Sequence, residues 1–375
     1  MDSAILKIPF LMPPLGDEEI EAASRVMRTK YLTGGGEADL FEKEFAEYIG
    51  TESAISTNSG TSALELVLHA YKCMGALRPG DKVLIPSFTF VAVANAVVNA
   101  GMEPVFADIT PQTMNIKLPN NIEDIKAAII VHTFGTPCDT SIIRYLQSKG
   151  VIVIEDCAEA MGARWWGSQK KVGSRGDCGI FSFAATKIMT TGDGGMITTN
   201  ATSLTEYIKL LRVHGLSSKI NSDERSAILP GHNYRMCNIL AAIGRVQLSK
   251  ADEFCKARRK HAQKLNELIT MEQIPVLTPW DFHYSVYQIY TIQLKEGDST
   301  TRAAVLKALR ERGIEAKVYF YPPIHQQAYY SSKYGDIGLK CTDRISERVI
   351  SLPMYPSLEE EEIEYMVQCL KEVLC

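Results

Sequence analysis

Two residues 31 positions apart, Asp156 and Lys187, have types and settings that could do chemistry together. Lys187 follows three small residues and precedes the glycine-rich turn Gly192-Asp-Gly-Gly195. A lysine amine held in a pocket can act as a nucleophile, form a Schiff base and carry protons. Asp156 ends the apolar run Val151-Ile-Val-Ile-Glu-Asp156, which is typical of a buried strand. An aspartate at such a strand end can hold a protonated ring nitrogen.

A third segment, Asn58-Ser-Gly-Thr-Ser62, lies between an expected strand and an expected helix. Backbone N–H groups at the start of a helix, with hydroxyl groups nearby, form a binding site for an anion such as phosphate. The same residues are also good N-caps for the following helix, and the sequence leaves both interpretations open. The segment is not a Walker loop, because the Gly-Lys-Ser/Thr ending is missing.

The lysine and the aspartate together favour pyridoxal phosphate chemistry. In this chemistry a lysine amine bonds to the cofactor's aldehyde, and an aspartate binds its pyridine nitrogen. Phe88 and Phe90 directly follow another strand, and either could stack on a planar cofactor or pack in the core. Each residue also has a plainer interpretation. A strand-end aspartate often caps a helix, and most lysines lie on the surface.

Other chemistries have weaker support. The Gly-x-Ser-x-Gly elbow is absent, and no Gly-x-Gly-x-x-Gly run joins a strand to a helix. The histidines show no His-x-x-x-His pair. The nine cysteines are dispersed without a Cys-x-x-Cys motif, which indicates reduced thiols in a cytoplasmic protein and no metal site.

Length and composition set the broad class of the protein. With 375 residues, 46% of them hydrophobic, the chain can bury a large core and is expected to form two domains. A net charge of −4 argues against nucleic acid as a partner, because binding phosphates needs a basic surface. Prolines and an acid interrupt the first residues, so no signal peptide is expected. No run approaches the roughly 20 apolar residues of a membrane span.

Apolar runs alternate with helical patterns through the first two thirds of the chain. The expected strands lie at 53–57, 81–86, 104–108, 127–132, 151–155, 179–183 and 195–199. Helices are expected at 16–30, 40–49, 63–74, 91–100, 140–149 and 204–212. This alternation predicts an α/β fold with a mainly parallel seven-stranded sheet that is covered by helices on both faces. Ligands of such sheets bind beyond the carboxyl ends of the strands.

The last third of the chain has a different pattern, after a polar loop at 213–231 that is long enough to suggest function. One long helix is expected at 238–269, then strands at 286–294 and 316–320 and helices at 301–312 and 359–374. We therefore expect a large cofactor-binding domain at 12–248 and a small α+β domain at 249–375. The first residues, 1–11, are expected to pack with the small domain.

Taken together, these residues resemble the sugar aminotransferases of the DegT/DnrJ/StrS family, a branch of the fold-type I pyridoxal phosphate enzymes. The resemblance runs from about Ile8 to the C-terminus. The segments that carry it are Tyr31-Leu-Thr-Gly34, Asn58–Ser62, Glu155-Asp-Cys-Ala-Glu-Ala-Met-Gly162, Phe181-Ser-Phe with Lys187 and Gly192–Gly195, Gly231-His-Asn-Tyr-Arg-Met236, Tyr321-Pro-Pro-Ile-His325 and Ser351-Leu-Pro-Met-Tyr-Pro356.

The resemblance implies a role for each matched residue that would face the cofactor. Lys187 would form the aldimine with pyridoxal 5'-phosphate and then shuttle the proton, and Asp156 would bind the ring nitrogen. Phe90 would stack on the ring. The phosphate would be held by Gly60, Thr61 and Ser182.

The resemblance also implies roles for positions whose residue type varies within the family or that would contact the substrate or the neighbouring subunit. Glu159 matches a position near the cofactor's hydroxyl that is glutamine in many members, so a glutamate there needs a shared proton or a different contact. Asn233 would reach the phosphate of the neighbouring subunit, which implies a homodimer with shared active sites. Ala184 stands where several members carry histidine, tyrosine or phenylalanine. The residues expected to line the substrate pocket are Tyr31, Thr33, Tyr321 and His325.

The implied reaction is a ping-pong transamination from glutamate to a nucleotide-linked ketosugar, as in aminosugar formation for polysaccharide or lipopolysaccharide. The run Thr190-Thr-Gly-Asp-Gly-Gly195 resembles members that aminate carbon 4, which favours a 4-keto-6-deoxy sugar. A 3-ketosugar or a cyclitol (inosose) substrate remains an alternative. Related dehydratases replace the lysine with histidine, and a non-catalytic regulatory homologue would lack Lys187 or Asp156, so both are less favoured.

Overall fold

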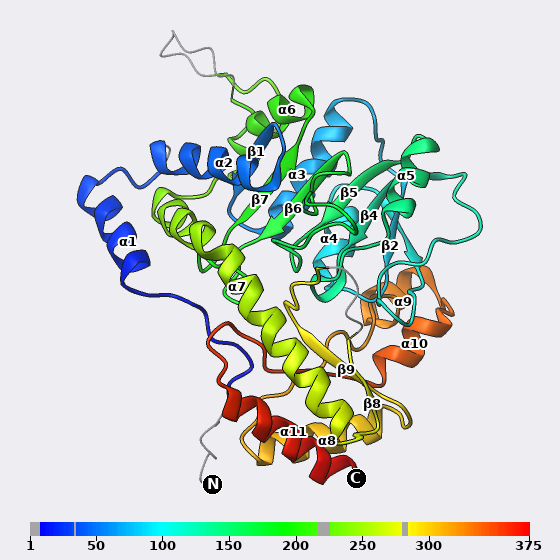
Figure 1. The fold of residues 1–375 in the computed structure, drawn as a ribbon. Helices are drawn as coiled ribbons and strands as arrows, with labels where there is room; N and C mark the ends of the chain where they lie inside the picture. Colours follow the sequence, from blue (N-terminus) through cyan, green and yellow to red (C-terminus); the bar gives the residue numbers. More distant parts are fainter. Residues whose placement is uncertain (1–7, 34, 217–225, 280–283) are drawn as a thin grey trace.

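The computed structural model describes residues 8–33, 35–216, 226–279 and 284–375 (Figure 1). Its centre is a seven-stranded sheet with the strand order β1-β7-β6-β5-β4-β2-β3. The strands are β1 (Ser53–Thr57), β2 (Lys82–Pro86), β3 (Glu103–Ala107), β4 (Ile125–Val131), β5 (Ile152–Asp156), β6 (Cys178–Ser182) and β7 (Gly195–Thr199). Only β7 runs against its two neighbours, and the other pairs are parallel. The predicted mainly parallel sheet is therefore confirmed.

Helices cover both faces of this sheet, because successive residues of its strands point to opposite sides. In β4, Ala128 and Ile130 belong to one apolar core, and Ala127 and Ile129 belong to the other. The helices of this part are α1 (Asp17–Thr29), α2 (Gly36–Ile49), α3 (Gly60–Cys73), α4 (Ala92–Asn99), α5 (Thr140–Ser148), α6 (Thr202–Arg212) and α7 (Asn238–Met271). Among the helices in the described ranges, none is both long and apolar enough to cross a membrane.

The C-terminal part contains a second, antiparallel sheet with the order β10-β9-β8. Its elements are β8 (Val276–Leu277), β9 (Tyr290–Leu294), α8 (Ser299–Glu311), α9 (Ala328–Tyr334), α10 (Lys340–Ser346), β10 (Val349–Leu352) and α11 (Glu360–Leu374). Short 3-10 turns, η1 (Thr133–Gly135) and η2 (Ile324–Gln326), complete the described elements. Ile8 lies beside this part, because its N–H donates to the Gly313 carbonyl at 2.9 Å.

Helix α7 runs from the large sheet to the second sheet, as Figure 1 shows. Ala251 and Phe254 belong to the core of the large part, and Ala262 and Leu265 belong to the core of the C-terminal part. The domain boundary expected at 248/249 falls inside this helix. The division into domains at 12–248 and 249–375 remains a prediction, and residues 1–7 of the N-terminal segment lie outside the described residues.

Two expected strands differ from the sequence prediction. The strand expected at 286–294 begins only at Tyr290, because the N–H of Val286 donates instead to the carbonyl of Gly135 at 3.1 Å. The strand expected at 316–320 is reduced to a single β-bridge at Lys317. Both deviations have the same physical reason: Gln288, Ile289, Tyr319 and Phe320 of these segments line a cavity against the large sheet rather than extending a sheet.

A buried arginine of α7 joins the two segments that flank the second sheet. Arg258 is only 2% exposed. Its Nη1 donates to the carbonyls of Met354 at 2.7 Å, Gln288 at 3.3 Å and Tyr287 at 3.4 Å. Burial lowers the pKa of this guanidinium to about 10. The cation is therefore held by main-chain dipoles rather than by a carboxylate partner among the described residues.

The substitution Arg258→Met should lower the free energy of unfolding by about 2–4 kcal/mol, because it leaves buried carbonyls without a donor. Urea unfolding checks this value. The control is Lys256→Met, which removes the same charge from an exposed position of α7. The control should change stability by no more than about 0.5 kcal/mol. Equal effects of the two substitutions on stability would contradict the structural role of Arg258 as a donor to buried carbonyls.

Candidate functional site

A cavity of about 390 Å³ opens beyond the carboxyl ends of β5 and β6, where a parallel sheet of this kind binds its ligands. Its wall combines the end of β5, the start of α3, the loop between β6 and β7, and segments of the C-terminal part. The sequence-predicted residues in this wall are Gly60, Thr61, Phe90, Asp156, Glu159, Ser182 and Lys187. Segments more than a hundred residues apart thus meet around one space.

Asp156 is the last residue of β5 and is buried between the neighbouring strands β4 and β6. Its Oδ1 accepts a hydrogen bond from the N–H of Ala158 at 3.0 Å. Burial raises the pKa of Asp156 to about 6, although the Ala158 N–H and the charge of Lys187 act in the opposite direction. An ionised carboxylate at this position is therefore stabilised by any cation that enters the cavity.

Lys187 lies on the loop that connects the antiparallel strands β6 and β7. A turn holds its backbone, since the Lys187 N–H donates to the carbonyl of Ala184 at 3.0 Å. The side chain of Gln288 donates to the carbonyl of Thr186 and so ties the loop to the C-terminal part. The Lys187 Nζ lies 3.8 Å from Oε1 of Glu159. The amine is thus presented to the cavity beside a carboxylate.

The start of α3 has the geometry of an anion site. Ser59 caps the helix by accepting the N–H of Ser62 at 3.1 Å. Within the described chain, no acceptor is seen for the N–H groups of Gly60 and Thr61, as expected for a first helical turn. A Cβ at Gly60 would lie 2.8 Å from the Cβ of Ser182, so only glycine allows this close approach. Capping and anion binding, both left open by the sequence, are compatible here.

The two phenylalanines after β2 have different environments. Phe88 is fully buried and packs edge-on against Phe134 and Phe320 at 5.9 and 5.7 Å between ring centroids. Phe90 is 60% exposed and lines the cavity. Core packing is therefore the role of Phe88, whereas the ring of Phe90 is available to a planar ligand.

The cavity fits a flat, protonated ring with a phosphate arm. Asp156 supplies the carboxylate for a ring nitrogen, and the start of α3 supplies N–H groups for the phosphate. Phe90 supplies an aromatic face. Lys187 supplies an amine for an aldehyde. These features match the chemistry of pyridoxal phosphate.

Five predicted site residues lie outside this cavity wall in the single chain, and four of them are exposed. Tyr31 is 76% exposed, and its carbonyl accepts from Nδ2 of Asn238 at 2.9 Å. Thr33 and Asn233 are also exposed, and Gly34 of the same motif lies outside the described residues. Tyr321 is partly exposed beneath the guanidinium of Arg302, 4.2 Å from its ring centroid. Their roles remain predictions, since one chain does not bring them to the cavity.

His325 is also outside the cavity wall, and its ring is buried. Its Nδ1 is paired with the hydroxyl of Ser87 at 2.6 Å, and its Nε2 with Oδ1 of Asp343 at 3.0 Å. Both ring nitrogens are thus used within the protein. Among the described residues, this geometry favours a structural role for His325, which joins η2 to the end of β2 and to α10, over the expected contact with substrate.

Several cavity residues were not identified from the sequence. Asp193 lies within the Gly-Asp-Gly-Gly turn that follows Lys187, but an aspartate between glycines is also common in simple turns and gave no separate signal. The others come from distant segments without a motif of their own, and they include Phe10, Leu11, Gln288, Tyr319 and Met354. No spacing rule links such residues, because only the packing of the C-terminal part against the sheet brings them to the cavity.

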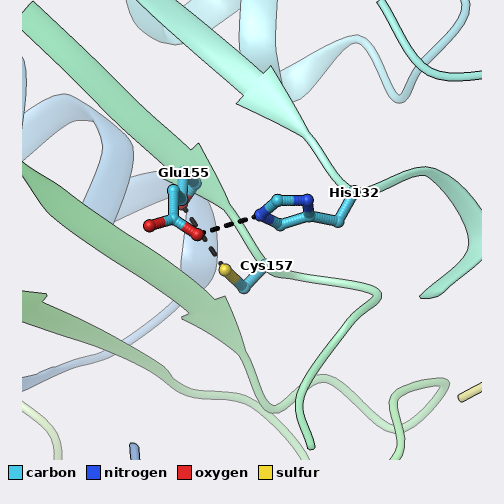
Figure 2. A group of neighbouring side chains, drawn as sticks. All are labelled: His132, Glu155 and Cys157. Carbon is cyan, nitrogen blue, oxygen red and sulfur yellow. Dashed lines mark hydrogen bonds and ion pairs between the residues drawn. The ribbon is translucent and has the colours of Figure 1, made fainter. Parts of the chain in front are cut away.

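A buried group of side chains beside the site, His132, Glu155 and Cys157, has the composition of a metal centre (Figure 2). Hydrogen bonds already use its ligand atoms. The carboxylate of Glu155 accepts from the N–H groups of residues 173, 175 and 176 at 2.6, 2.6 and 2.5 Å. Nδ1 of His132 accepts from the N–H of Cys138 at 3.0 Å, so Nε2 carries the proton that it donates to Glu155 at 3.1 Å.

This hydrogen-bonded group holds the strand ends that carry the site. The N–H of His132 donates to the carbonyl of Asp156 at 3.1 Å, which links the end of β4 to the end of β5. Glu155 precedes Asp156 in the chain and anchors the turn that leads into β6. The group therefore orients Asp156 through hydrogen bonds. Because these bonds already use its polar atoms, the group has a structural role rather than the character of a metal site.

Known proteins resemble this chain over nearly its whole length. A family model described as the DegT/DnrJ/EryC1/StrS aminotransferase family matches residues 13–371. A GDP-perosamine synthase of Caulobacter vibrioides is 39% identical, with 99% of this chain and 100% of the relative covered. The spore coat polysaccharide biosynthesis protein SpsC of Bacillus subtilis is 33% identical, with 98% of this chain and 97% of the relative covered.

Solved structures also share the fold. Helicobacter pylori PseC, an aminotransferase involved in the biosynthesis of pseudoaminic acid, superimposes with a TM-score of 0.92. It is 28% identical, and the match covers 98% of this chain and 99% of PseC. An aminotransferase of Psychrobacter cryohalolentis has a TM-score of 0.87 at 28% identity, with 97% and 98% covered.

In ligand-free protein, Asp156→Asn should increase stability at neutral pH. The pKa of Asp156 is raised from 3.8 to about 6, so the folded state retains a proton that the unfolded chain releases. This contribution is fully present below the unfolded pKa and is lost as pH rises through 6, which costs about 3 kcal/mol. Urea unfolding should show the variant about 1–3 kcal/mol more stable at pH 7.5 and nearly equal to the unmodified protein at pH 4.

The matched control is Asp336→Asn at an exposed position. This variant should follow the unmodified protein at both pH values. A stability difference for Asp156→Asn that does not depend on pH would contradict the proposed burial of its charge.

Proposed function

The chain belongs to the DegT/DnrJ/EryC1/StrS aminotransferase family, and on this premise we propose that it uses pyridoxal 5'-phosphate to aminate a nucleotide-linked ketosugar with glutamate as donor. One observation carries the proposal: a single cavity contains a lysine amine, a buried strand-end carboxylate and the open N–H groups of a helix start. That set matches the aldehyde, ring nitrogen and phosphate of the cofactor.

Each cavity residue has a proposed task in holding the cofactor. The N–H groups of Gly60 and Thr61, with the hydroxyl of Ser182, bind the phosphate. Phe90 covers one face of the ring, and Asp156 keeps the ring nitrogen protonated. Bound in this way, the cofactor supplies an aldehyde that accepts the amino group and a ring that withdraws electrons.

Lys187 is the proposed proton carrier. Its amine takes the proton from the Cα of glutamate in the first half-reaction, and it delivers a proton to the aminated sugar carbon in the second. The turn that joins Lys187 to Ala184 and the contact of Gln288 with Thr186 keep the amine directed at the cavity. Correct placement matters because a proton moves only between atoms within hydrogen-bond reach.

Other observations support the proposed sugar substrate. The name of the GDP-perosamine synthase relative supports a nucleotide-linked sugar, and the run Thr190–Gly195 favours a 4-keto-6-deoxy sugar. Ala184 lines the cavity, and its small side chain leaves room for a sugar ring near Lys187. Tyr31, Thr33 and Tyr321 are the proposed contacts of the substrate.

A homodimer with shared sites is part of this proposal. Asn233 is exposed, and its neighbour Tyr234 accepts the N–H of Asn58 at 2.8 Å, which ties the segment to the proposed phosphate turn. From this exposed segment, Asn233 would reach the phosphate of the neighbouring subunit. The cytoplasmic location expected from the sequence also remains a prediction.

The substitution Lys187→Ala should reduce transamination by at least about 1,000-fold, because it removes both the nucleophile and the proton carrier. The measurement is amino-group transfer from glutamate, together with loss of the visible absorbance of the cofactor joined to the lysine. Lys126→Ala, at an exposed position of β4, is the control and should retain full activity. A Lys187→Ala protein that turns over normally would refute the proposal.

The substrate class can be tested on protein that glutamate has already converted to its amino form. Nucleotide-linked 4-keto-6-deoxy sugars should return the protein to its starting spectrum, and NMR of the product should place nitrogen on carbon 4. Nitrogen on carbon 3 would instead indicate a 3-ketosugar substrate, and reaction with an inosose alone would indicate a cyclitol aminotransferase. No reaction with any of these carbonyl compounds would favour the regulatory homologue.

A further inference from the structure

A second cavity, of about 730 Å³, lies between the large part of the molecule and the C-terminal part. No residue lines both this cavity and the first one, which contains Lys187. Its wall combines the segment that follows β3, one side of α7, the strands β8 and β9, and α10. Its volume is within the range of about 300–1,000 Å³ that is typical of small-molecule sites. The second cavity is therefore large enough for a ligand of its own.

One face of β9 forms the inner wall of the second cavity. Successive residues of a strand point to opposite faces of the sheet. Ile292 and Leu294 belong to the core of the C-terminal part, whereas Gln293 between them lines the cavity. Gln293 is only 7% exposed, and its side-chain amide has no hydrogen-bond partner among the described residues. A buried amide is costly to leave unpaired, so this group is suited to a polar ligand that enters the cavity.

A second amide in the same wall also has unused hydrogen-bonding capacity. Asn266 of α7 lines the cavity, and its Oδ1 accepts the hydroxyl of Tyr290 at 2.6 Å. This bond holds the side chain and leaves its NH₂ group without a partner in the described part of the chain. Asparagine and glutamine amides pair well with a ring edge that presents a donor beside an acceptor, as nucleotide bases do.

The opening of the second cavity carries positive charge. Lys340 and Arg344 are four residues apart on α10, so their side chains lie on the same face of the helix. Both are exposed, and neither has an ion-pair partner among the described residues. The described wall contains no carboxylate. Asp108 already accepts the N–H groups of Cys341 and Thr342 at 3.1 and 2.8 Å, so the two side chains rather than the helix start supply the charge.

We propose that the second cavity binds a nucleoside phosphate. Lys340 and Arg344 hold its phosphate at the opening, because charged donors form the strongest hydrogen bonds to phosphate oxygens. The amides of Asn266 and Gln293 pair with the edge of its base further inside. The order of the wall from exposed cations to a buried amide sets this orientation. The site lies outside the first cavity, so its occupation does not depend on the proposed amino-group transfer.

The thiol of Cys341 provides a local measurement of binding, because it is free and partly buried in the wall of the second cavity. The experiment follows alkylation of this thiol by iodoacetamide, using mass spectrometry, while ADP or GDP is added. At a nucleotide concentration ten times the apparent Kd, alkylation should be about tenfold slower, since only the free protein reacts. Cys73, at the exposed end of α3, is the internal control and should react at an unchanged rate.

Two substitutions test the two halves of the site. Arg344→Met should raise the nucleotide concentration needed for protection by about tenfold or more, because a charged donor to the phosphate is lost. The matched control is Arg144→Met at an exposed position of α5, which should leave that concentration unchanged. Gln293→Leu should weaken protection by nucleotides by about tenfold while leaving any weak protection by pyrophosphate unchanged. If Gln293→Leu does not fold, the exposed Arg344→Met still decides the test.

Alkylation of Cys341 that neither ADP nor GDP slows would overturn the inference. Equal protection by pyrophosphate and by the nucleotides would also overturn it, because the amides would then bind no base. Equal behaviour of Arg344→Met and Arg144→Met would show that the cations of α10 take no part. The labelling uses neither glutamate nor sugar, so its outcome is independent of transamination. Failure of the proposed function would appear instead as a lack of amino-group transfer in protein whose Cys341 is still protected.

Discussion

A carboxylate buried at the end of a central strand is the constraint on which the site depends. Asp156 lies between two parallel neighbours and is only 5% exposed, and burial raises its pKa to about 6. An ionised group in such surroundings is costly unless a cation lies nearby. The nearby lysine and the proposed protonated ring nitrogen, which would enter through the cavity, are the cations that would stabilise this carboxylate.

Other parts of the structure hold Asp156 and Lys187 in position. The hydrogen-bonded group of His132 and Glu155 links the ends of β4 and β5 and anchors the turn into β6. The loop of Lys187 is closed by the antiparallel pairing of β6 with β7. Arg258 connects α7 to the segments that supply the far wall of the cavity. The charges that would perform the proposed chemistry are thus supported by His132, Glu155 and Arg258, which lie outside the cavity wall.

Much of the fold could be predicted because its signals are local. The strands of the large sheet are five to seven residues long and mostly apolar, and their alternation with helices predicts parallel pairing. Residues 286–289 and 316–320 looked equally strand-like but form no strand, and Gln288, Ile289, Tyr319 and Phe320 line the cavity instead. The difference lies in what each segment packs against, which is a property of the assembled molecule.

From the sequence alone, a lysine, a strand-end aspartate and a helix-start turn favour pyridoxal phosphate chemistry, and the family resemblance implies a role for each of them. The assembled fold was needed to show that Phe90 rather than Phe88 faces the cavity, and that His325 is paired on both ring nitrogens. It also decided which oxygen of Glu159 meets Lys187. Local spacing sets capping and periodicity, whereas such contacts depend on how segments far apart in the chain pack together, and packing is a property of the whole fold.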